Sequence, residues 1–158
     1  MKGEVLLAYF AGLIDGEGYI GAKRRLPTKN NRMQSPKYSV AFFIAMTDRA
    51  PVQLLAEFCG SGGAVRSRTR KEGYKTIYEF ELENERAATL LQQIQPYIVG
   101  HVDQVRLALL LQALRWASPG LKNKSKLPAY YVAQCDEIYE KLKGISPRSG
   151  QPGRWRSK

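Results

Sequence analysis

The sequence predicts an α+β domain in which a helix precedes two strands, a second helix precedes two further strands, and more helices follow. Apolar residues recur at helical spacing near the N-terminus and along the C-terminal half of the chain. Between them, four segments alternate apolar and polar residues, which is the pattern of half-buried strands. This αββαββα order predicts a four-stranded antiparallel sheet with one apolar face, and extra helices at the C-terminal end.

The boundaries follow from the periodicity and from residues that cap or break helices. Thr47 or Asp48 is placed to cap the second helix, and Asn84 is placed to cap the third. Pro96 ends the third helix, and Gly144 closes the last one. In chain order, we expect helix 4–17, strands 19–26 and 37–46, helix 48–59, strands 65–70 and 77–82, and helices 85–95, 102–116 and 128–142.

Length and composition suit one folded unit. The chain has 158 residues, of which 44% are hydrophobic, and this is enough for a core of its own. We expect a single domain at residues 1–143. Residues 144–158 are rich in Pro, Gly, Ser and Arg, and we expect them to form a basic, mobile tail.

The formal net charge of +11 is large for this length and indicates a polyanionic partner. Most of the 25 basic residues fall in the segments 23–37, 66–75 and 143–158. Only one acid, Glu72, lies within these segments. Such clustering favours a binding surface, because a face that is only solvated usually mixes both signs of charge.

The sequence predicts no disulfide, no histidine-rich metal site and no membrane span. Cys59 and Cys135 have neither a pairing motif nor metal-ligand spacing, and the chain has a single His. No apolar run approaches the ~20 residues that cross a membrane, and no secretory signal is visible. We expect an intracellular protein, in a bacterial or phage cytoplasm or in an organelle.

The N-terminal helix carries small residues along one side. Ala8, Gly12 and Gly16 recur every four residues, and we call them the small-residue stripe. Each Gly lowers the stability of a helix by about 1 kcal/mol relative to Ala, so two glycines in one helix indicate a structural or functional requirement. A line of small side chains lets two helix backbones approach closely, while Phe10 and Leu13 on the opposite side suit a core.

The end of this helix reads Phe10-Ala11-Gly12-Leu13-Ile14-Asp15-Gly16-Glu17-Gly18. It resembles the LAGLIDADG motif of homing endonucleases, with Phe10 for Leu, Gly16 for Ala and Glu17 for Asp as departures. The predicted element order is also that of the LAGLIDADG endonuclease fold, so the resemblance covers roughly residues 3–116. It implies a DNA-binding sheet and a site-specific endonuclease that makes a staggered double-strand break in a long, partly palindromic DNA site.

The resemblance also implies roles for the acids of the motif. Glu17 matches the metal-binding acid, and Asp15 matches the acid that caps and holds the helix ends. A chain with a single motif needs a second copy, so we expect a homodimer whose small-residue stripes cross. Two Glu17 carboxylates then meet, each helped by the backbone carbonyl near Gly16 to bind Mg²⁺, with Mn²⁺ or Ca²⁺ as other occupants. The metal ions would activate water and hold the scissile phosphates.

The strands supply the surface that we expect to lie in the major groove of double-stranded DNA. Alternate residues project from one side of a strand, and on the first three strands they are mainly basic. On the fourth strand, Glu79 and Glu81 either accept from cytosine amino groups or face water. The expected DNA-binding residues are Lys23, Arg25, Lys37, Ser39, Arg66, Arg68, Arg70 and Lys75.

Two basic side chains are candidates for the catalytic centre. His101 stands where the family commonly has Lys; it assists proton transfer, contacts phosphate, or starts a helix without catalytic duty. Arg49 follows the second strand, where the resemblance implies a polar or basic side chain near the metal ions. The family often has Gln in this region, and this chain has Met46 and Thr47.

Two alternatives on the same fold stay open from the sequence. One is a maturase that binds its host intron RNA, which the basic loop 122–126 and the basic tail would serve. The other is a DNA-binding protein with weakened catalysis, against which the retained Glu17 argues. Filter binding of duplex DNA against structured RNA separates the first, and a magnesium-dependent nicking assay decides the second.

Overall fold

The computed structural model describes residues 3–30, 33–60, 65–69, 72–118 and 126–145. It confirms the predicted α+β fold, with a four-stranded sheet and extra helices at the C-terminal end. In chain order the elements are α1 (Gly3–Glu17), β1 (Gly18–Arg25), β2 (Lys37–Met46), α2 (Arg49–Phe58), β3 (Arg66–Arg68), β4 (Ile77–Glu83), α3 (Asn84–Ile94), the 3-10 turn η1 (Gln95–Tyr97), α4 (Val102–Ala117) and α5 (Ala129–Ile145).

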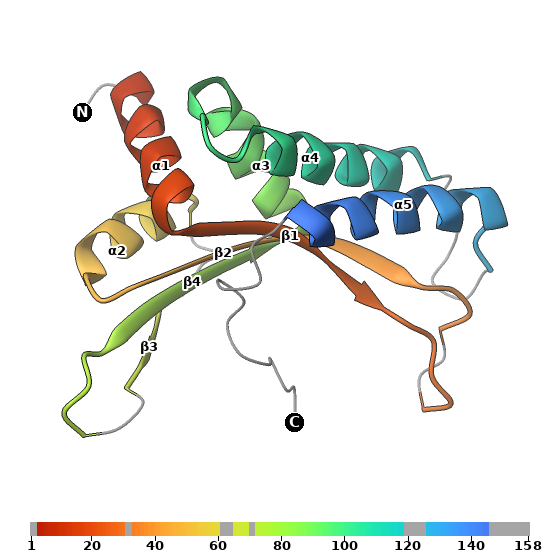
Figure 1. Ribbon diagram of the computed structural model, residues 1–158, viewed down its shortest axis with the longest axis horizontal. Coiled ribbons are helices and arrows are strands. Elements are labelled where there is room, and N and C mark those ends of the chain that lie inside the picture. The colour runs from red at the N-terminus through yellow and green to blue at the C-terminus, as the bar shows by residue number, and fades with distance from the viewer. Residues whose placement is uncertain (1–2, 31–32, 61–64, 70–71, 119–125, 146–158) are drawn as a thin grey trace.

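The four strands form one antiparallel sheet in the order β1-β2-β4-β3. The register places Ile20 opposite Phe42 and Phe42 opposite Leu82, so these apolar side chains share one face. The helices lie on that side of the sheet, with α4 and α5 along it and α1 standing steeply at one end (Figure 1). No described helix covers the other side, which we call the open face (Figure 1).

The core lies between the helix layer and the sheet. Phe10 of α1, Phe42 of β2 and Phe80 of β4 are among its largest fully buried side chains. The rings of Phe42 and Phe80 meet edge-on with centroids 6.4 Å apart, and Phe10 lies 5.0 Å from the ring of Phe58 on α2. Tilted aromatic pairs at these distances are favourable. The apolar side of α1 and the inner face of the sheet therefore form one core.

The predicted cap of α2 is confirmed, and the predicted cap of α3 is wrong. Asp48 caps α2, because its carboxylate accepts the Ala50 N–H at 3.0 Å. Asn84 instead is the first residue of α3, with a φ of 55°, and the N-cap Glu83 makes no side-chain hydrogen bond. The Asn84 side-chain oxygen accepts from Arg115 of α4. Asn tolerates this left-handed backbone better than most residues, which explains its place between β4 and α3.

Two predicted ends also differ from the structure. β3 is shorter than the expected 65–70, because only Arg66, Ser67 and Arg68 pair with β4. α5 continues through Gly144 to Ile145, because Gly144 does not take the positive φ of a glycine that ends a helix. Residues 146–158, which hold most of the expected tail, lie outside the described residues. None of the described helices is long and apolar enough to cross a membrane.

Candidate nucleic-acid interface and metal centre

Helix α1 leads into β1 without a connecting loop. This tight junction depends on Gly18, because a Cβ there would lie 2.7 Å from the Ile14 carbonyl oxygen. The junction places two acids close together in the sequence but in different surroundings. Asp15 is half-buried, and Glu17 is exposed as the last residue of the helix.

Asp15 fastens the end of α1 to the segment that precedes α4. Its Oδ2 accepts the Val99 N–H at 2.8 Å, and its Oδ1 accepts the His101 N–H at 3.0 Å. The His101 ring Nδ1 lies 3.2 Å from the same Oδ1 and donates to it, because an ionised carboxylate only accepts. Burial opposes the charge, but hydrogen bonds from Val99, Gly100 and His101 outweigh it and lower the pKa of Asp15.

His101 is the N-cap of α4, and its ring contacts Asp15 rather than projecting into solvent. The side chains of His101 and Asp15 are only 16% and 18% exposed. A ring nitrogen that is engaged by a half-buried carboxylate fixes both side chains. The contact favours the structural alternative for His101, in which the ring positions Asp15.

Glu17 offers one exposed carboxylate per chain. Among the described residues, no three His, Cys, Asp or Glu side chains gather in a way that could hold a metal ion. A metal ion at Glu17 would therefore need further ligands from backbone carbonyls, water, substrate or a second copy of the chain. Mg²⁺ suits such a sparse ligand set, because it keeps several waters and binds phosphate oxygens. One exposed carboxylate suits such a sparse site, and the metal-binding role of Glu17 stays a prediction.

The small-residue stripe of α1 is exposed in the single chain. Ala8, Gly12 and Gly16 all face solvent, and beside them Val5 is 56% and Tyr9 is 42% exposed. Nothing lies within 4 Å of a Cβ built at Gly12 or Gly16. Each Gly lowers helix stability by about 1 kcal/mol, and no neighbour in the described part of the chain requires it. The described part of the chain therefore gives no reason for these two glycines.

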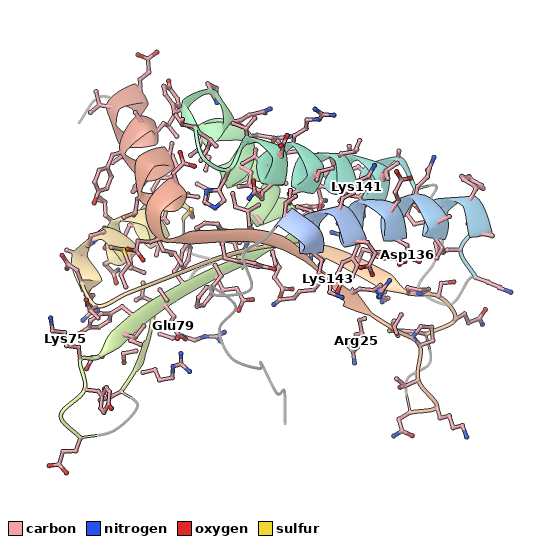
Figure 2. The ribbon with its side chains drawn as sticks, in the orientation of Figure 1. Arg25, Lys75, Glu79, Asp136, Lys141 and Lys143 are labelled. Carbon is pink, nitrogen blue, oxygen red and sulfur yellow. The ribbon has the colours of Figure 1, made fainter. Side chains whose placement is uncertain are left out.

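The open face carries alternate residues of all four strands. Residues that lie opposite each other in the register share a face, as Arg25 and Lys37 do at one end and Arg66 and Glu79 do at the other. Arg25 and Glu79 point to the uncovered side in Figure 2. Of the expected DNA-binding residues, Arg70 lies outside the described residues, Lys23 and Ser39 are half-buried, and the exposed ones are Arg25, Lys37, Arg66, Arg68 and Lys75.

Three acids of β4 lie among these basic residues. Arg68 Nη2 is 2.7 Å from Oε1 of Glu79, whose side chain is only 8% exposed. Lys23 reaches across β2 to pair with both Glu81 and Glu83. The alternative that Glu79 and Glu81 simply face water is therefore wrong. The alternation of acids at 79, 81 and 83 with buried residues between them was the signal that could have revealed this.

Arg24 belongs to the first basic segment but lies on the helix side of the sheet. Its guanidinium is 2.6 Å from Asp136 and 3.2 Å from Glu140, both on α5. It also lies 4.5 Å from the centroid of the Tyr139 ring. Figure 2 shows Asp136 between α5 and the sheet. Arg24 therefore fastens α5 to the end of β1 and does not belong to the open face.

Arg49 is the first residue of α2, shortly after the end of β2. It is exposed, and its guanidinium carbon lies 6.0 Å from the centroid of the Tyr78 ring on β4. This distance is the outer limit of a cation–π contact. The structure thus places Arg49 against the sheet, and its catalytic role stays a prediction.

Several solved structures that share this architecture are homing endonucleases bound to DNA. Homing endonuclease I-CvuI, in complex with the I-CreI target, aligns with a TM-score of 0.66 and 16% identity over 98% of this chain and 87% of that chain. The archaeal intron-encoded homing endonuclease I-Vdi141I, complexed with DNA, aligns with a TM-score of 0.69 and 12% identity over 93% and 87%. The LAGLIDADG homing endonuclease I-LtrWI, bound to target DNA, aligns with a TM-score of 0.64 and 18% identity over 95% of this chain and 49% of that chain.

The chain has the LAGLIDADG homing endonuclease fold. No family model and no curated protein matches the sequence, so the likeness is one of structure. Within the LAGLIDADG fold, α1 is the helix that carries the motif, and its acidic end meets the sheet at Gly18. The open face is the side of the LAGLIDADG sheet that no described helix covers (Figure 1).

Proposed function

We propose that this chain is a site-specific DNA endonuclease that acts inside the cell as a homodimer and depends on a divalent metal ion, Mg²⁺. The observation that carries the proposal is the exposed small-residue stripe of α1, which ends at the exposed carboxylate of Glu17. A partner helix would give Gly12 and Gly16 a function that no neighbour among the described residues gives them. The structurally similar I-CvuI and I-Vdi141I are homing endonucleases in complex with DNA, which supports the substrate class.

The partner of α1 is a second copy of this chain. Two identical stripes cross about a two-fold axis, so the same surface serves both subunits. Backbones approach most closely where side chains are smallest, at Ala8, Gly12 and Gly16. The alignments support two copies of the fold in the active unit. The chain covers 49% of I-LtrWI, so one I-LtrWI chain has room for two such units, whereas the chain covers 87% of I-CvuI, which has room for one.

The crossing brings the two Glu17 side chains together near the two-fold axis. Each Glu17 carboxylate, with a backbone carbonyl near Gly16, would hold one metal ion. When bound, such ions activate water and stabilise charge on the scissile phosphates. Asp15 fixes the end of α1 against Val99 and His101, and thereby positions Glu17 relative to the sheet. Arg49 is the remaining candidate for contact with a phosphate near this centre.

The open face lies in the major groove, which is wide enough to admit β-structure. A strand of the length of β2 spans about nine base pairs, so each subunit reads a half-site of about that length. Two subunits then recognise a partly palindromic site of about 20 base pairs. Arg25 and Lys75 are exposed and make no ion pair with other described residues, so they are free to contact bases or phosphates.

The test starts with sites that the wild-type protein cleaves, selected from a randomised duplex library in Mg²⁺. Single-turnover cleavage is then measured for wild type, Glu17→Gln and the control Glu57→Gln. Glu57 is an exposed acid on α2, so its substitution makes the same charge change away from the proposed centre. We expect Glu17→Gln to bind the site normally and to cut it at background rate, and Glu57→Gln to cut like wild type.

Three outcomes would contradict this proposal. Near-normal cutting by Glu17→Gln would remove the metal assignment. Specific duplex binding without cutting by wild type would leave a DNA-binding protein with weakened catalysis. Tighter binding of structured RNA than of any duplex would favour the maturase alternative.

A further inference from the structure

Lys23, Glu81 and Glu83 form a charged cluster on the open face that spans three strands. Lys23 is on β1 and the two acids are on β4, with β2 between them. The ammonium pairs with Oε1 of both acids. The side chain on β2 that lies opposite Glu83 is Ala41, which is small enough to leave room for Lys23 to reach across the strand.

The balance of charge in this cluster is unlike that of a phosphate-binding surface. Two carboxylates surround one ammonium, so the cluster carries a net negative charge and repels the DNA backbone. Burial disfavours the charged ammonium, but hydrogen bonds to Glu81 and Glu83 outweigh this and raise the pKa of Lys23. Lys23 therefore stays charged and paired, and its side chain is 43% exposed.

The geometry of the cluster leaves a defined set of hydrogen-bonding groups for a ligand. An ammonium has three N–H donors, and the two acids use two of them. Each carboxylate contacts Lys23 through Oε1 and keeps a second oxygen, Oε2, as an acceptor. Major-groove edges offer N–H donors only at the exocyclic amino groups of cytosine and adenine, next to ring or carbonyl acceptors. The third N–H of Lys23, held between the acceptors of Glu81 and Glu83, therefore complements the edge of a base pair that has an amino group next to an acceptor.

We propose that Lys23, Glu81 and Glu83 act together as a specificity-determining cluster that accepts a hydrogen bond from a cytosine or adenine amino group in each half-site. Lys23 holds the two carboxylates in place and donates its third N–H to the acceptor beside that amino group. A base pair that presents an acceptor at this position faces a carboxylate and is rejected. This inference rests on the proposed function, because it requires the open face to lie in the major groove.

The cluster and the exposed basic residues should affect DNA binding in different ways. Arg25 and Lys75 raise the affinity for any duplex by contacting polyanionic DNA. The cluster lowers the affinity for DNA in general and increases the difference in affinity between DNA sequences. Unfavourable contacts contribute to specificity in this way. Removing one carboxylate charge should therefore tighten binding to non-specific DNA and weaken discrimination at the same time.

The experiment compares binding selections from a randomised duplex library by wild type, Glu81→Gln and Glu83→Gln, with Glu57→Gln as the matched charge control. Gln keeps the shape of Glu but both donates and accepts, so it tolerates either kind of base edge. We expect each cluster variant to lose about tenfold preference at one or two positions per half-site. Affinity for a non-specific duplex should rise, and the thermal midpoint of either variant should stay near that of wild type.

Selection profiles of both variants that match the wild-type profile would overturn the inference, even if the variants are less stable, because the cluster would then be a structural link between strands. A uniform loss of affinity for every duplex would also overturn it, since that result marks a phosphate contact. Wild-type protein that prefers no duplex sequence would contradict the proposed function, and this inference with it. A changed profile in the cluster variants, with Glu57→Gln like wild type, supports the inference.

Discussion

The junctions between the layers and the exposed surfaces of this molecule use the same residue types in different roles. At the junctions, Asp15 accepts hydrogen bonds from the segment before α4, and Arg24 pairs with Asp136 of α5. On the exposed surfaces, Glu17 ends α1 in solvent and Arg25 projects from the open face. Asp15 and Glu17 are two positions apart, and Arg24 and Arg25 are neighbours. Helix and strand geometry, rather than residue type, separates the structural charges from the functional ones.

This comparison predicts that substitutions at the two kinds of region fail in different ways. A junction variant loses folding stability, because it removes hydrogen bonds or ion pairs that hold two elements together. A surface variant keeps its stability and loses assembly, DNA binding or cleavage. A functional measurement therefore has to be paired with a stability measurement for each variant.

The largest effect is expected at the small-residue stripe. Gly12→Leu places a branched side chain where two α1 helices cross, and we expect loss of the dimer and cleavage at background rate. The single chain has room for Leu, since Gly12 is exposed with nothing within 4 Å of its Cβ position, so the monomer should stay folded. Sedimentation, circular dichroism and cleavage check this.

Gly144→Leu is the matched control for Gly12→Leu. Gly144 also lies in a helix with nothing within 4 Å of its Cβ position, but on α5. A Gly12→Leu protein that dimerises and cuts like Gly144→Leu would show that the small-residue stripe does not form the dimer interface.

The neighbours Arg24 and Arg25 lie on opposite faces of the sheet and should fail in opposite ways. We expect Arg25→Ala to weaken DNA binding by about 1–3 kcal/mol without a change in thermal midpoint. Arg24→Ala should leave DNA binding unchanged and lower the free energy of unfolding by about 1 kcal/mol, since it removes the ion pairs of Arg24 with Asp136 and Glu140. Binding titrations and thermal unfolding of both variants test the assignment. Exchanged phenotypes would mean that the faces are assigned the wrong way round.

Asp15→Asn tests the other junction through its pH dependence. The folded protein lowers the pKa of Asp15, so its ionised form adds stability above the unfolded pKa and loses it as pH falls through the folded pKa. We expect Asp15→Asn to be less stable by about 1–3 kcal/mol at neutral pH. The difference from wild type should shrink below about pH 4. Denaturant titrations at several pH values measure the free energy of unfolding of both proteins. A difference that is constant with pH would show that the charge of Asp15 does not stabilise the fold.

The smallest effect is expected at His101. If the ring only positions Asp15, His101→Ala should change single-turnover cleavage by less than about tenfold, whereas loss of an acid–base group typically costs 10²–10⁴-fold. His101→Asn retains a side-chain donor towards Asp15 and should recover part of any lost stability. A loss of cleavage beyond a hundredfold in both variants, with stability intact, would give the ring a catalytic duty.

The sequence predicted the fold and the motif helix because both depend on local patterns. Alternation defined the strands, and the spacing of Ala8, Gly12 and Gly16 by itself defined one side of α1. Asp48 was predictable as a cap because a cap acts within a few residues of itself.

The contacts that the sequence did not predict are those between distant segments. Arg24 alternates to the helix side of β1, but its partner Asp136 is more than a hundred residues away, and no local pattern pairs them. Lys23 pairs across β2 with acids of β4, which requires the strand order β1-β2-β4. Asn84 accepts from Arg115 of α4 instead of capping its own helix. In each case a tertiary partner decided the role of a residue whose type was already clear.

A cross-link at the crossing of the two α1 helices tests directly whether the chain dimerises through the small-residue stripe. Gly12→Cys places one thiol per chain on the stripe, and two copies that cross there bring the Cα atoms within the ~4.4–6.8 Å that a disulfide spans. Gly144→Cys is the control on α5, and wild type controls for the native Cys59 and Cys135. Under mild oxidation we predict a covalent dimer of Gly12→Cys that still binds its DNA site, and none for the controls. A Gly12→Cys protein that stays uncross-linked and sediments as a monomer with and without DNA would contradict the account.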